Sequence, residues 1–292
     1  MKDQRILLVG SKGMLAHAVA RSLARRGMSA IGVDQEQCDV TNAASVRATF
    51  DRLRPTVAIN CAAYTAVDKA EQEEALATRV NGEGPGHLAA ACRDFDATLV
   101  HFSTDFVFDG QADQPYREED PPAPVSAYGR SKLAGEVAIG TSGHEDWLIL
   151  RTAWLYGPAG RPFPKVILDA ARAGKPLRVV GDQHGSPTFT FDLAEATLDL
   201  LDKGARGLFH ATNGGRTTWF DFARIACDCF GVTPAELTPI SAADWAEMKP
   251  DSARRPAFSV LDLSRLESTL GRPMRRWDVA LRDYCAITAG NP

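Results

Sequence analysis

The residues with the clearest chemical potential are Tyr128 and Lys132, which stand four positions apart in the run Tyr-Gly-Arg-Ser-Lys. Residues at this spacing share one face of a helix, so the phenol and the ammonium are predicted to lie side by side. A phenol has a pKa of about 10, and a neighbouring cation stabilises the phenolate; lowering that pKa by about three units takes roughly 4 kcal/mol. The pair therefore predicts a proton donor for a carbonyl, although the pattern alone is also typical of a surface helix.

A hydroxyl group upstream makes this interpretation more specific. Ser103-Thr104-Asp105 stands at the end of the apolar run 98–103, which predicts a buried strand. The carboxyl end of a strand in a parallel sheet faces the ligand crevice. Thr104 is therefore expected to hydrogen-bond a substrate carbonyl and polarise it. Thr104, Tyr128 and Lys132 are the predicted catalytic residues.

A glycine-containing loop predicts a dinucleotide site near the N-terminus. It follows the apolar run 6–9 and opens a predicted helix. Glycines permit a tight turn close to a pyrophosphate, and a helix N-terminus offers free N–H groups. The spacing is Gly-x-x-Gly-x-x-Ala rather than Gly-x-Gly-x-x-Gly, and a lone glycine pattern also occurs in ordinary turns. The expected cofactor-binding residues of the loop are Gly10, Lys12, Gly13, Met14 and Leu15.

Two acidic residues extend this expected site. Asp34 ends the second predicted strand, where a carboxylate accepts hydrogen bonds from ribose hydroxyls. Its charge would repel a 2′-phosphate, but Lys12 would offset that repulsion, so both NADPH and NADH are candidate cofactors. Asp39 and Val40 follow shortly and are expected near the adenine. Lys132 would also hydrogen-bond the nicotinamide ribose.

These residues need a scaffold of strands that alternate with helices. Apolar runs predict strands at 6–9, 30–33, 57–60, 98–103 and 147–152. Helical patterns cover 14–26, 43–53, 71–93 and 126–139, the third interrupted by Gly82, Gly84, Pro85 and Gly86. Such alternation predicts an α/β fold, a doubly wound parallel sheet of the Rossmann type. Residues 1–152 are expected to form this dinucleotide-binding domain.

In the second half of the chain the alternation of strands and helices is less regular, and glycine and proline are frequent. Helices are predicted at 191–201, 220–230 and 278–286, and a strand at 207–211. Residues 153–292 are expected to form a smaller C-terminal α/β substrate-binding domain. The two domains would be interwoven, because the chain is expected to return to the first one around residues 190–213.

Composition narrows the class of protein. The chain has 292 residues, a net charge of −4 and a pI of about 5.9, a balance that does not favour nucleic acid. No apolar run is long enough to span a bilayer, and no signal peptide is recognised. The cysteines and histidines are scattered, which favours neither a disulfide framework nor a metal site. We expect a cytoplasmic enzyme with no metal and no nucleic-acid or membrane partner.

Further segments carry a resemblance that covers nearly the whole chain. They are Gly10 to Leu15, Asn60 to Glu71, Val80-Asn81, Ser103 to Gly110, Tyr128 to Lys132, Arg151 to Gly157, Gln183 to Thr188 and Arg255 to Asp262. Through them the chain resembles the dTDP-4-dehydrorhamnose reductase family of the extended short-chain dehydrogenase/reductase superfamily. The segments 67–71 and 255–262 are the most family-specific.

The resemblance implies a reaction and further site residues. The 4-keto group of dTDP-4-dehydro-L-rhamnose would be reduced to give dTDP-L-rhamnose by hydride transfer from NADPH or NADH, with Tyr128 as proton donor. Ala62, Ala63 and Tyr64 would line the cofactor cleft. The residues expected at the dTDP-sugar are Val67, Asp68, Thr104, Asp105, Tyr128, Trp154 and Arg255. An arginine suits a diphosphate because its guanidinium pairs with two phosphate oxygens at once.

Alternatives to this reading concern both assembly and function. Leu15 stands where some family members place a residue of a magnesium-bridged dimer, so a monomer or a homodimer without metal is expected. A nucleotide-sugar epimerase or dehydratase on the same fold stays open, as does a non-catalytic regulatory subunit. Dehydratases commonly carry two adjacent acids after the threonine, but Phe106 follows Asp105 here. Regulatory relatives can lose catalytic residues that this chain keeps.

Overall fold

The structure is a computed structural model that describes residues 4–289. Within this range the central sheet contains, in spatial order, β2 (Ala30–Val33), β1 (Ile6–Val9), β3 (Val57–Asn60), β4 (Thr98–Thr104), β5 (Trp147–Thr152) and β10 (Gly207–His210). Every neighbouring pair in this sheet is parallel. The predicted doubly wound parallel sheet is therefore confirmed, and the predicted strands agree with the observed ones to within a residue.

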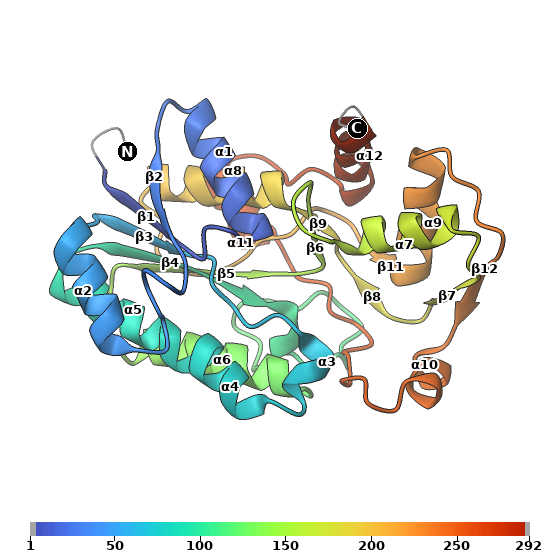
Figure 1. Cartoon of the computed structure of the whole chain (residues 1–292), viewed down its shortest axis with the longest axis horizontal. Coiled ribbons are helices and arrows are strands. Elements are labelled where there is room, and N and C mark those ends of the chain that lie inside the picture. The colour runs from blue at the N-terminus through green and yellow to red at the C-terminus, as the bar shows by residue number, and fades with distance from the viewer. Residues whose placement is uncertain (1–3, 290–292) are drawn as a thin grey trace.

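Helices cover both faces of the sheet (Figure 1). The first face carries α1 (Met14–Arg25), α8 (Thr190–Asp202) and α11 (Ser264–Leu270), and the second carries α2 (Ala43–Leu53), α5 (Gly84–Asp94) and α6 (Ala127–Gly140). This cover is required because β1 and β3 are buried along their whole length. Val19 and Leu23 of α1 fill the core on the first face, and Phe50 of α2 fills the core on the second.

The strand order reverses at β1, which pairs with β2 on one side and with β3 on the other. Ligands of such sheets bind beyond the carboxyl ends of the strands at a reversal of this kind. Backbone hydrogen bonds join the loops at this edge of the sheet. The N–H groups of Gly10 and Ser11 both donate to the carbonyl of Val33, at 2.9 and 3.2 Å. The N–H of Cys61 donates to the carbonyl of Val9 at 2.9 Å.

The single helix predicted at 71–93 is divided. The chain forms α3 (Val67–Ala70), α4 (Glu74–Thr78), the π-helical turn η1 (Arg79–Glu83) and then α5. Pro85 cannot donate a backbone hydrogen bond, and the wider turn before it accommodates that loss. The turn also positions Asn81, whose side chain accepts from the Tyr64 N–H at 2.8 Å and donates to the Ser131 hydroxyl at 3.0 Å. Asn81 thus joins the loop after β3 to α6.

Apart from the 3₁₀ turn η2 (Asp105–Val107), which follows β4, the remaining elements form the right-hand part of Figure 1. They are β6 (Leu155–Tyr156), α7 (Phe163–Arg172), β7 (Leu177–Val180), β8 (His184–Gly185), β9 (Thr188–Phe189), β11 (Thr217–Thr218), α9 (Trp219–Cys229), β12 (Leu237–Ile240), α10 (Ala242–Met248) and α12 (Trp277–Ala289). The strands here pair two by two: β6 with β9, β7 with β12, and β8 with β11. An aromatic core that includes Tyr156, Phe189, Phe222 and Trp277 holds this part together. The helices predicted at 191–201, 220–230 and 278–286 correspond to α8, α9 and α12.

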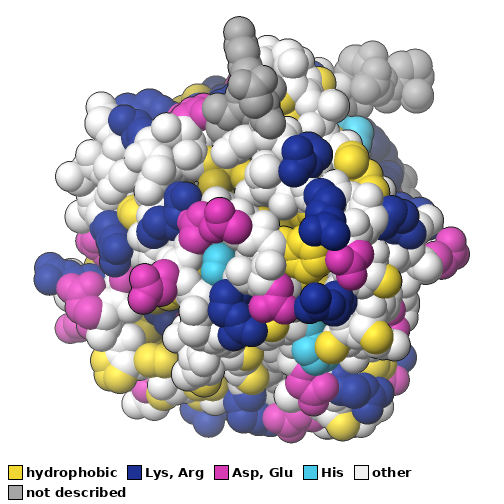
Figure 2. Space-filling view, turned by 90° about the vertical axis from the view of Figure 1, so that its left-hand side faces the viewer, with side chains coloured by type: hydrophobic (Ala, Val, Ile, Leu, Met, Phe, Trp, Pro, Cys, Tyr) yellow, Lys and Arg dark blue, Asp and Glu magenta, His cyan; other side chains and the backbone are white. Residues whose placement is uncertain are grey.

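Several features concern the described residues as a whole. No helix within residues 4–289 is both long and apolar enough to cross a membrane. In the same range no group of three or more His, Cys, Asp or Glu side chains is arranged to hold a metal ion, and the six cysteines there are free. On the face shown in Figure 2, acidic and basic side chains are interspersed.

Candidate active site

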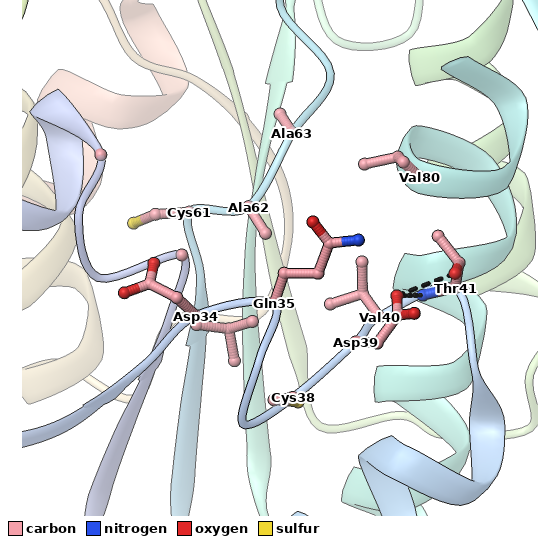
Figure 3. A pocket seen from close by; sticks show the side chains of 13 residues that line it. Asp34, Gln35, Cys38, Asp39, Val40, Thr41, Cys61, Ala62, Ala63 and Val80 are labelled. Atoms are coloured by element: carbon pink, nitrogen blue, oxygen red, sulfur yellow. Dashed lines mark hydrogen bonds between the residues drawn. The ribbon is translucent and has the colours of Figure 1, made fainter. Parts of the chain in front are cut away.

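A cavity of about 300 Å³ lies at the carboxyl ends of β1, β2 and β3, and we call it the glycine-loop cavity (Figure 3). It is lined by Val9, Gly10, Gly13, Asp34, Gln35, Cys38, Asp39, Val40, Thr41, Cys61, Ala62, Ala63 and Val80. Ala62 and Ala63 border it on one side and Val80 on another, while Gln35 extends between them. Of the predicted cofactor residues, Gly10, Gly13, Asp34, Asp39, Val40, Ala62 and Ala63 lie on this wall. The predicted residues Lys12, Met14, Leu15, Tyr64 and Lys132 lie outside it.

The part of the cavity wall between β1 and α1 is formed by backbone rather than by side chains. Gly10 has a φ of +74°, and a Cβ there would lie 2.7 Å from the backbone nitrogen of Ala62, so only glycine fits. Gly13 is the N-cap of α1 and, within the described residues, supplies no side-chain hydrogen bond to the first turn. The N–H groups that open α1 thus remain available, with the positive end of the helix dipole behind them. This arrangement fits the pyrophosphate of a dinucleotide.

Asp34 is held rigidly at the end of β2. Its carboxylate accepts hydrogen bonds from the Ser11 hydroxyl at 2.8 Å and from the Lys12 N–H at 3.1 Å. The Lys12 ammonium is 77% exposed and lies 4.0 Å from the same carboxylate. Asp39 is fixed differently, because its carboxylate accepts from both the N–H and the hydroxyl of Thr41. Asp34 therefore presents a fixed negative charge to the cavity, and Lys12 offers a mobile positive charge beside it.

Thr104 and Tyr128 meet at the carboxyl end of β4. Thr104 donates to Asp105 at 3.0 Å and accepts from the Phe106 N–H, and Ser126 caps α6 just before Tyr128. Burial raises the pKa of Tyr128 to about 12; the charge of Asp105 adds to this rise, and hydrogen bonding with Thr104 opposes it. Tyr128 is thus firmly protonated at neutral pH. That the Lys132 ammonium lowers this pKa stays a prediction.

Asp105 supports Thr104 rather than facing solvent. Its side chain is 1% exposed, and its second carboxylate oxygen has no hydrogen-bond partner among the described residues. Burial raises the pKa of the Asp105 carboxyl to about 6, and the hydrogen bond from Thr104 opposes this rise. A direct contact with a sugar, as the resemblance implied, would require this side chain to be uncovered.

Lys132 points inward from α6. Its ammonium nitrogen lies 2.6 Å from the carbonyl of Phe102 and 3.3 Å from Nε2 of His101, and the residue is 2% exposed. Burial lowers the pKa of Lys132 to about 8, and the carboxylate of Glu136 acts in the opposite direction. Glu136 is itself paired with Arg151, at 2.7 Å. Lys132 is therefore a buried cation whose charge is lost on mild alkalinisation.

Trp154 occupies a strained position between β5 and β6. Its φ of +48° is unusual for a side chain of this size. The indole stacks on Trp219 with ring centres 3.6 Å apart, and a Cβ at Gly185 would lie 2.5 Å from it. The surrounding contacts thus hold the ring in place, and they explain why glycine is needed in the 183–188 turn.

The remaining predicted substrate residues lie at the junction of the two halves of the molecule. Arg255 donates to the Asp68 carboxylate at 2.7 Å, and the N–H of Ala253 donates to the same oxygen at 3.0 Å. Val67, half-buried, begins α3 beside Asp68. Because Arg255 is paired with Asp68, any anion that binds Arg255 must compete with this carboxylate.

A second cavity, of about 380 Å³, lies next to Arg255, and we call it the aromatic cavity. It is lined by Phe163, Val166, Ile167, Arg178, Val179, Val180, Gln183, Trp219, Trp245 and Arg255. The two tryptophans and two arginines of this lining suit a flat aromatic base joined to phosphates. Trp219 stacks on Trp154, so the wall of this cavity is in contact with the segment between β5 and β6.

Residues 4–289 match the sequence profile of the RmlD substrate binding domain family. The chain belongs to this family. It is 41% identical over 291 residues to the dTDP-4-dehydrorhamnose reductase of Streptomyces griseus, covering 98% of this chain and 94% of that protein. It is 39% identical to the dTDP-4-keto-6-deoxy-D-glucose reductase of Streptomyces niveus, covering 95% of each.

A solved structure of the same family is closely similar throughout. The dTDP-4-dehydrorhamnose reductase of Bacillus anthracis, determined in complex with NADP, superimposes with a TM-score of 0.91 at 33% identity and 99% coverage of both chains. The resemblance inferred from the motifs is thereby confirmed for the family and the fold.

Sequence reasoning missed most of the aromatic cavity. Phe163, Arg178, Trp219 and Trp245 stand in separate segments, and no spacing connects them. The single available signal was the abundance of aromatic residues in the second half, which also supplies ordinary core. The wall residues Gln35, Cys38, Thr41 and Val80 of the glycine-loop cavity were missed as well, although their neighbours were named.

Proposed function

We propose that this protein reduces the 4-keto group of dTDP-4-dehydro-L-rhamnose to give dTDP-L-rhamnose, with NADPH or NADH as cofactor. The observation that carries the proposal is that Tyr128 packs against Phe106, two residues after Thr104, at the carboxyl edge of the sheet, with Lys132 on the same helix as Tyr128. The glycine-loop cavity lies at the same edge of the sheet. The relative from Streptomyces griseus is named for this reaction, and the relative from Bacillus anthracis was solved with NADP.

The proposed roles follow from the protonation states. A nicotinamide dinucleotide, when bound in the glycine-loop cavity, supplies the hydride. Thr104 positions and polarises the carbonyl oxygen, and Tyr128, protonated because its pKa is raised to about 12, donates its proton to that oxygen. The ammonium of Lys132 favours the phenolate that remains. Because the pKa of Lys132 is lowered to about 8, reduction should slow as the pH rises past that value.

The two halves of the chain would bind different ligands. Residues 1–152 would bind the dinucleotide, through the predicted loop residues and through Ala62, Ala63 and Tyr64. Residues 153–292 would bind the dTDP-sugar, with its nucleoside diphosphate in the aromatic cavity near Arg255 and its sugar near Trp154, Val67 and Asp68. We propose that the enzyme acts in the cytoplasm as a monomer or a homodimer.

A second substrate has specific support. The relative from Streptomyces niveus is named for a 4-keto-6-deoxy-D-glucose substrate and is nearly as similar as the relative from Streptomyces griseus. The two candidates share the dTDP group and the 4-keto group and differ in the sugar ring. A panel of dTDP-4-keto sugars, each assayed with NADH and with NADPH, distinguishes them.

The decisive test of the chemistry is Tyr128→Phe. We expect turnover to fall about 10²- to 10⁴-fold, because the proton donor is lost, while dinucleotide binding stays within about twofold. Tyr116→Phe is the matched control: it removes a buried hydroxyl that bonds Asp109 and should lower thermal stability without lowering turnover. Equal turnover in Tyr128→Phe refutes the role of Tyr128. Tightly retained dinucleotide with sugar interconversion would indicate an epimerase, and dinucleotide binding without turnover would indicate a regulatory subunit.

A further inference from the structure

Lys132 is contacted by a network of buried polar groups whose hydrogen-bond directions can be assigned. The network runs from the Ala62 N–H through Asn60 and His101 to Lys132. Asn60 is 2% exposed and His101 is fully buried. The distances between successive heavy atoms are 3.1 Å from Ala62 N to Asn60 Oδ1, 3.1 Å from Asn60 Nδ2 to His101 Nδ1, and 3.3 Å from His101 Nε2 to Lys132 Nζ.

The backbone N–H of Ala62 sets the donor and acceptor directions of this network. The N–H of Ala62 can only donate, so the atom of Asn60 that faces it must be the carbonyl oxygen. The amide nitrogen of Asn60 then faces His101 and can only donate, so Nδ1 of His101 must accept. Burial holds the pKa of His101 well below its ordinary value, and the ring is therefore neutral. A neutral ring that accepts at Nδ1 carries its one proton on Nε2.

That proton points at Lys132. An ammonium has three donors and no acceptor, so it cannot accept a hydrogen bond from the Nε2–H of His101. A neutral amine has a lone pair that accepts from His101 while one of its N–H groups donates to the carbonyl of Phe102, at 2.6 Å. Both contacts of Lys132 are therefore satisfied together in the amine form and conflict in the ammonium form.

The other ionisable groups around Lys132 do not remove this conflict. Glu136, one turn further along α6, favours the ammonium, but its carboxylate is shared with Arg151 and the Ser103 hydroxyl. Cys61, on the loop after β3, is neutral because burial raises the pKa of its thiol. Tyr128, one turn earlier on α6, is protonated.

We propose that Asn60 and His101 are positioning residues that hold a fixed N–H donor against Nζ of Lys132 and so favour its amine over its ammonium form. Lys132 then acts as a group that exchanges its proton readily rather than as a permanent cation. Its kinetic consequence rests on the proposed function, in which the ammonium assists Tyr128. The effect on Lys132 itself does not depend on any substrate.

The direct test is the titration of Lys132 by NMR in protein carrying ¹³C-labelled lysine, with the resonance assigned by its absence in Lys132→Met. In the wild type we expect a midpoint at least one pH unit below that of an ordinary lysine, which titrates at about 10.4. His101→Gln can turn its amide oxygen toward Lys132, so we expect its midpoint to rise by about one unit. A wild-type midpoint near the ordinary value, or an unmoved midpoint in folded His101→Gln, overturns the proposal.

A second variant reverses the hydrogen-bond directions of the network without removing the histidine. In Asn60→Asp, the carboxylate still accepts from Ala62 but also accepts at His101, which moves the ring proton to Nδ1 and leaves an Nε2 lone pair facing Lys132. We expect the midpoint to rise here too, even if His101→Gln fails to fold. His144→Gln changes another buried histidine, whose side chain makes no hydrogen bond with Asn60, His101 or Lys132 in the described part of the structure. It should leave the midpoint unmoved. A purely structural role for His101 would lower thermal stability and leave the titration in place.

The kinetic readout separates this proposal from the proposed function. If the protein is the proposed reductase, the alkaline limb of kcat/KM should move upward in His101→Gln by the same amount as the titration. If no keto sugar is reduced, the proposed function fails while the titration still decides the role of His101. A shifted titration with an unshifted alkaline limb would mean that Lys132 does not assist Tyr128.

Discussion

The glycine-loop cavity and the aromatic cavity are built by opposite means. The first consists mainly of backbone and small side chains that directly follow β1, β2 and β3, and the start of α1, the positive end of its dipole, borders it. The second consists of large side chains, among them Phe163, Trp219 and Trp245, from segments far apart in the chain. The comparison suggests that a backbone-built site recognises the common part of a ligand, whereas a side-chain-built site discriminates among ligands.

The largest effect is expected at Gly10. In Gly10→Ala the new Cβ would meet the backbone of Ala62, and neither group can move freely. We expect dinucleotide affinity to fall on the order of 100-fold, about 3 kcal/mol, as measured by quenching of protein fluorescence. Gly27→Ala is the control, since Gly27 has a similar φ of +70° but nothing within 4 Å. It should cost about 1 kcal/mol of stability and leave affinity unchanged. Equal dinucleotide affinity in both variants would contradict the conclusion that the backbone at Gly10 forms the dinucleotide site.

The next largest effect is expected at Trp219, in the aromatic cavity. Trp219→Ala removes a wall of the cavity and the stacking partner of Trp154. If a nucleobase binds there, affinity for dTDP should fall about 10- to 100-fold, the range for loss of an aromatic stack, while dinucleotide affinity is kept. Titration calorimetry with dTDP and with NADP⁺ measures both. Loss of dinucleotide affinity with unchanged dTDP affinity would contradict the division between the cavities.

A smaller effect is expected at Asp34, the charged side chain of the glycine-loop cavity. Asp34→Asn keeps the shape but removes a fixed negative charge at the expected position of the adenosine ribose. We expect the ratio of NADPH affinity to NADH affinity to rise about tenfold. Lys12→Ala, which removes the mobile cation beside Asp34, should lower the same ratio. A ratio unmoved by either variant would show that the ribose does not bind beside Asp34.

The smallest effect is expected at Asp68, where the two halves of the molecule meet. Asp68→Asn breaks the ion pair with Arg255 but can still accept from the N–H of Ala253. Because Asp68 is half exposed, the loss should be about 0.5 kcal/mol, a decrease in Tm of about 1–2 °C. Freed from its partner, Arg255 should bind dTDP more tightly. Weaker dTDP binding in this variant would mean that Asp68 itself contacts the ligand.

Several parts of the fold could be predicted from sequence because they depend on local patterns. Buried parallel strands are continuous apolar runs, so β1, β3 and β4 were placed nearly to the residue. The 71–93 region was harder, because Pro85 and the neighbouring glycines indicate an interruption but not its form. A π-helical turn depends on the packing of Asn81 against Tyr64 and α6, which no local pattern encodes.

The sequence by itself determined the glycine loop, the spacing of Tyr128 and Lys132 and the positions of the sheet strands along the chain, since each follows from periodicity and short-range backbone geometry. Only the tertiary structure decided how those groups are protonated. Burial raises the pKa of Tyr128, and the fold places the side-chain nitrogen of Lys132 against Phe102 and His101. Protonation depends on which atoms exclude water and which donors face one another, and those neighbours come from strands far apart in the chain.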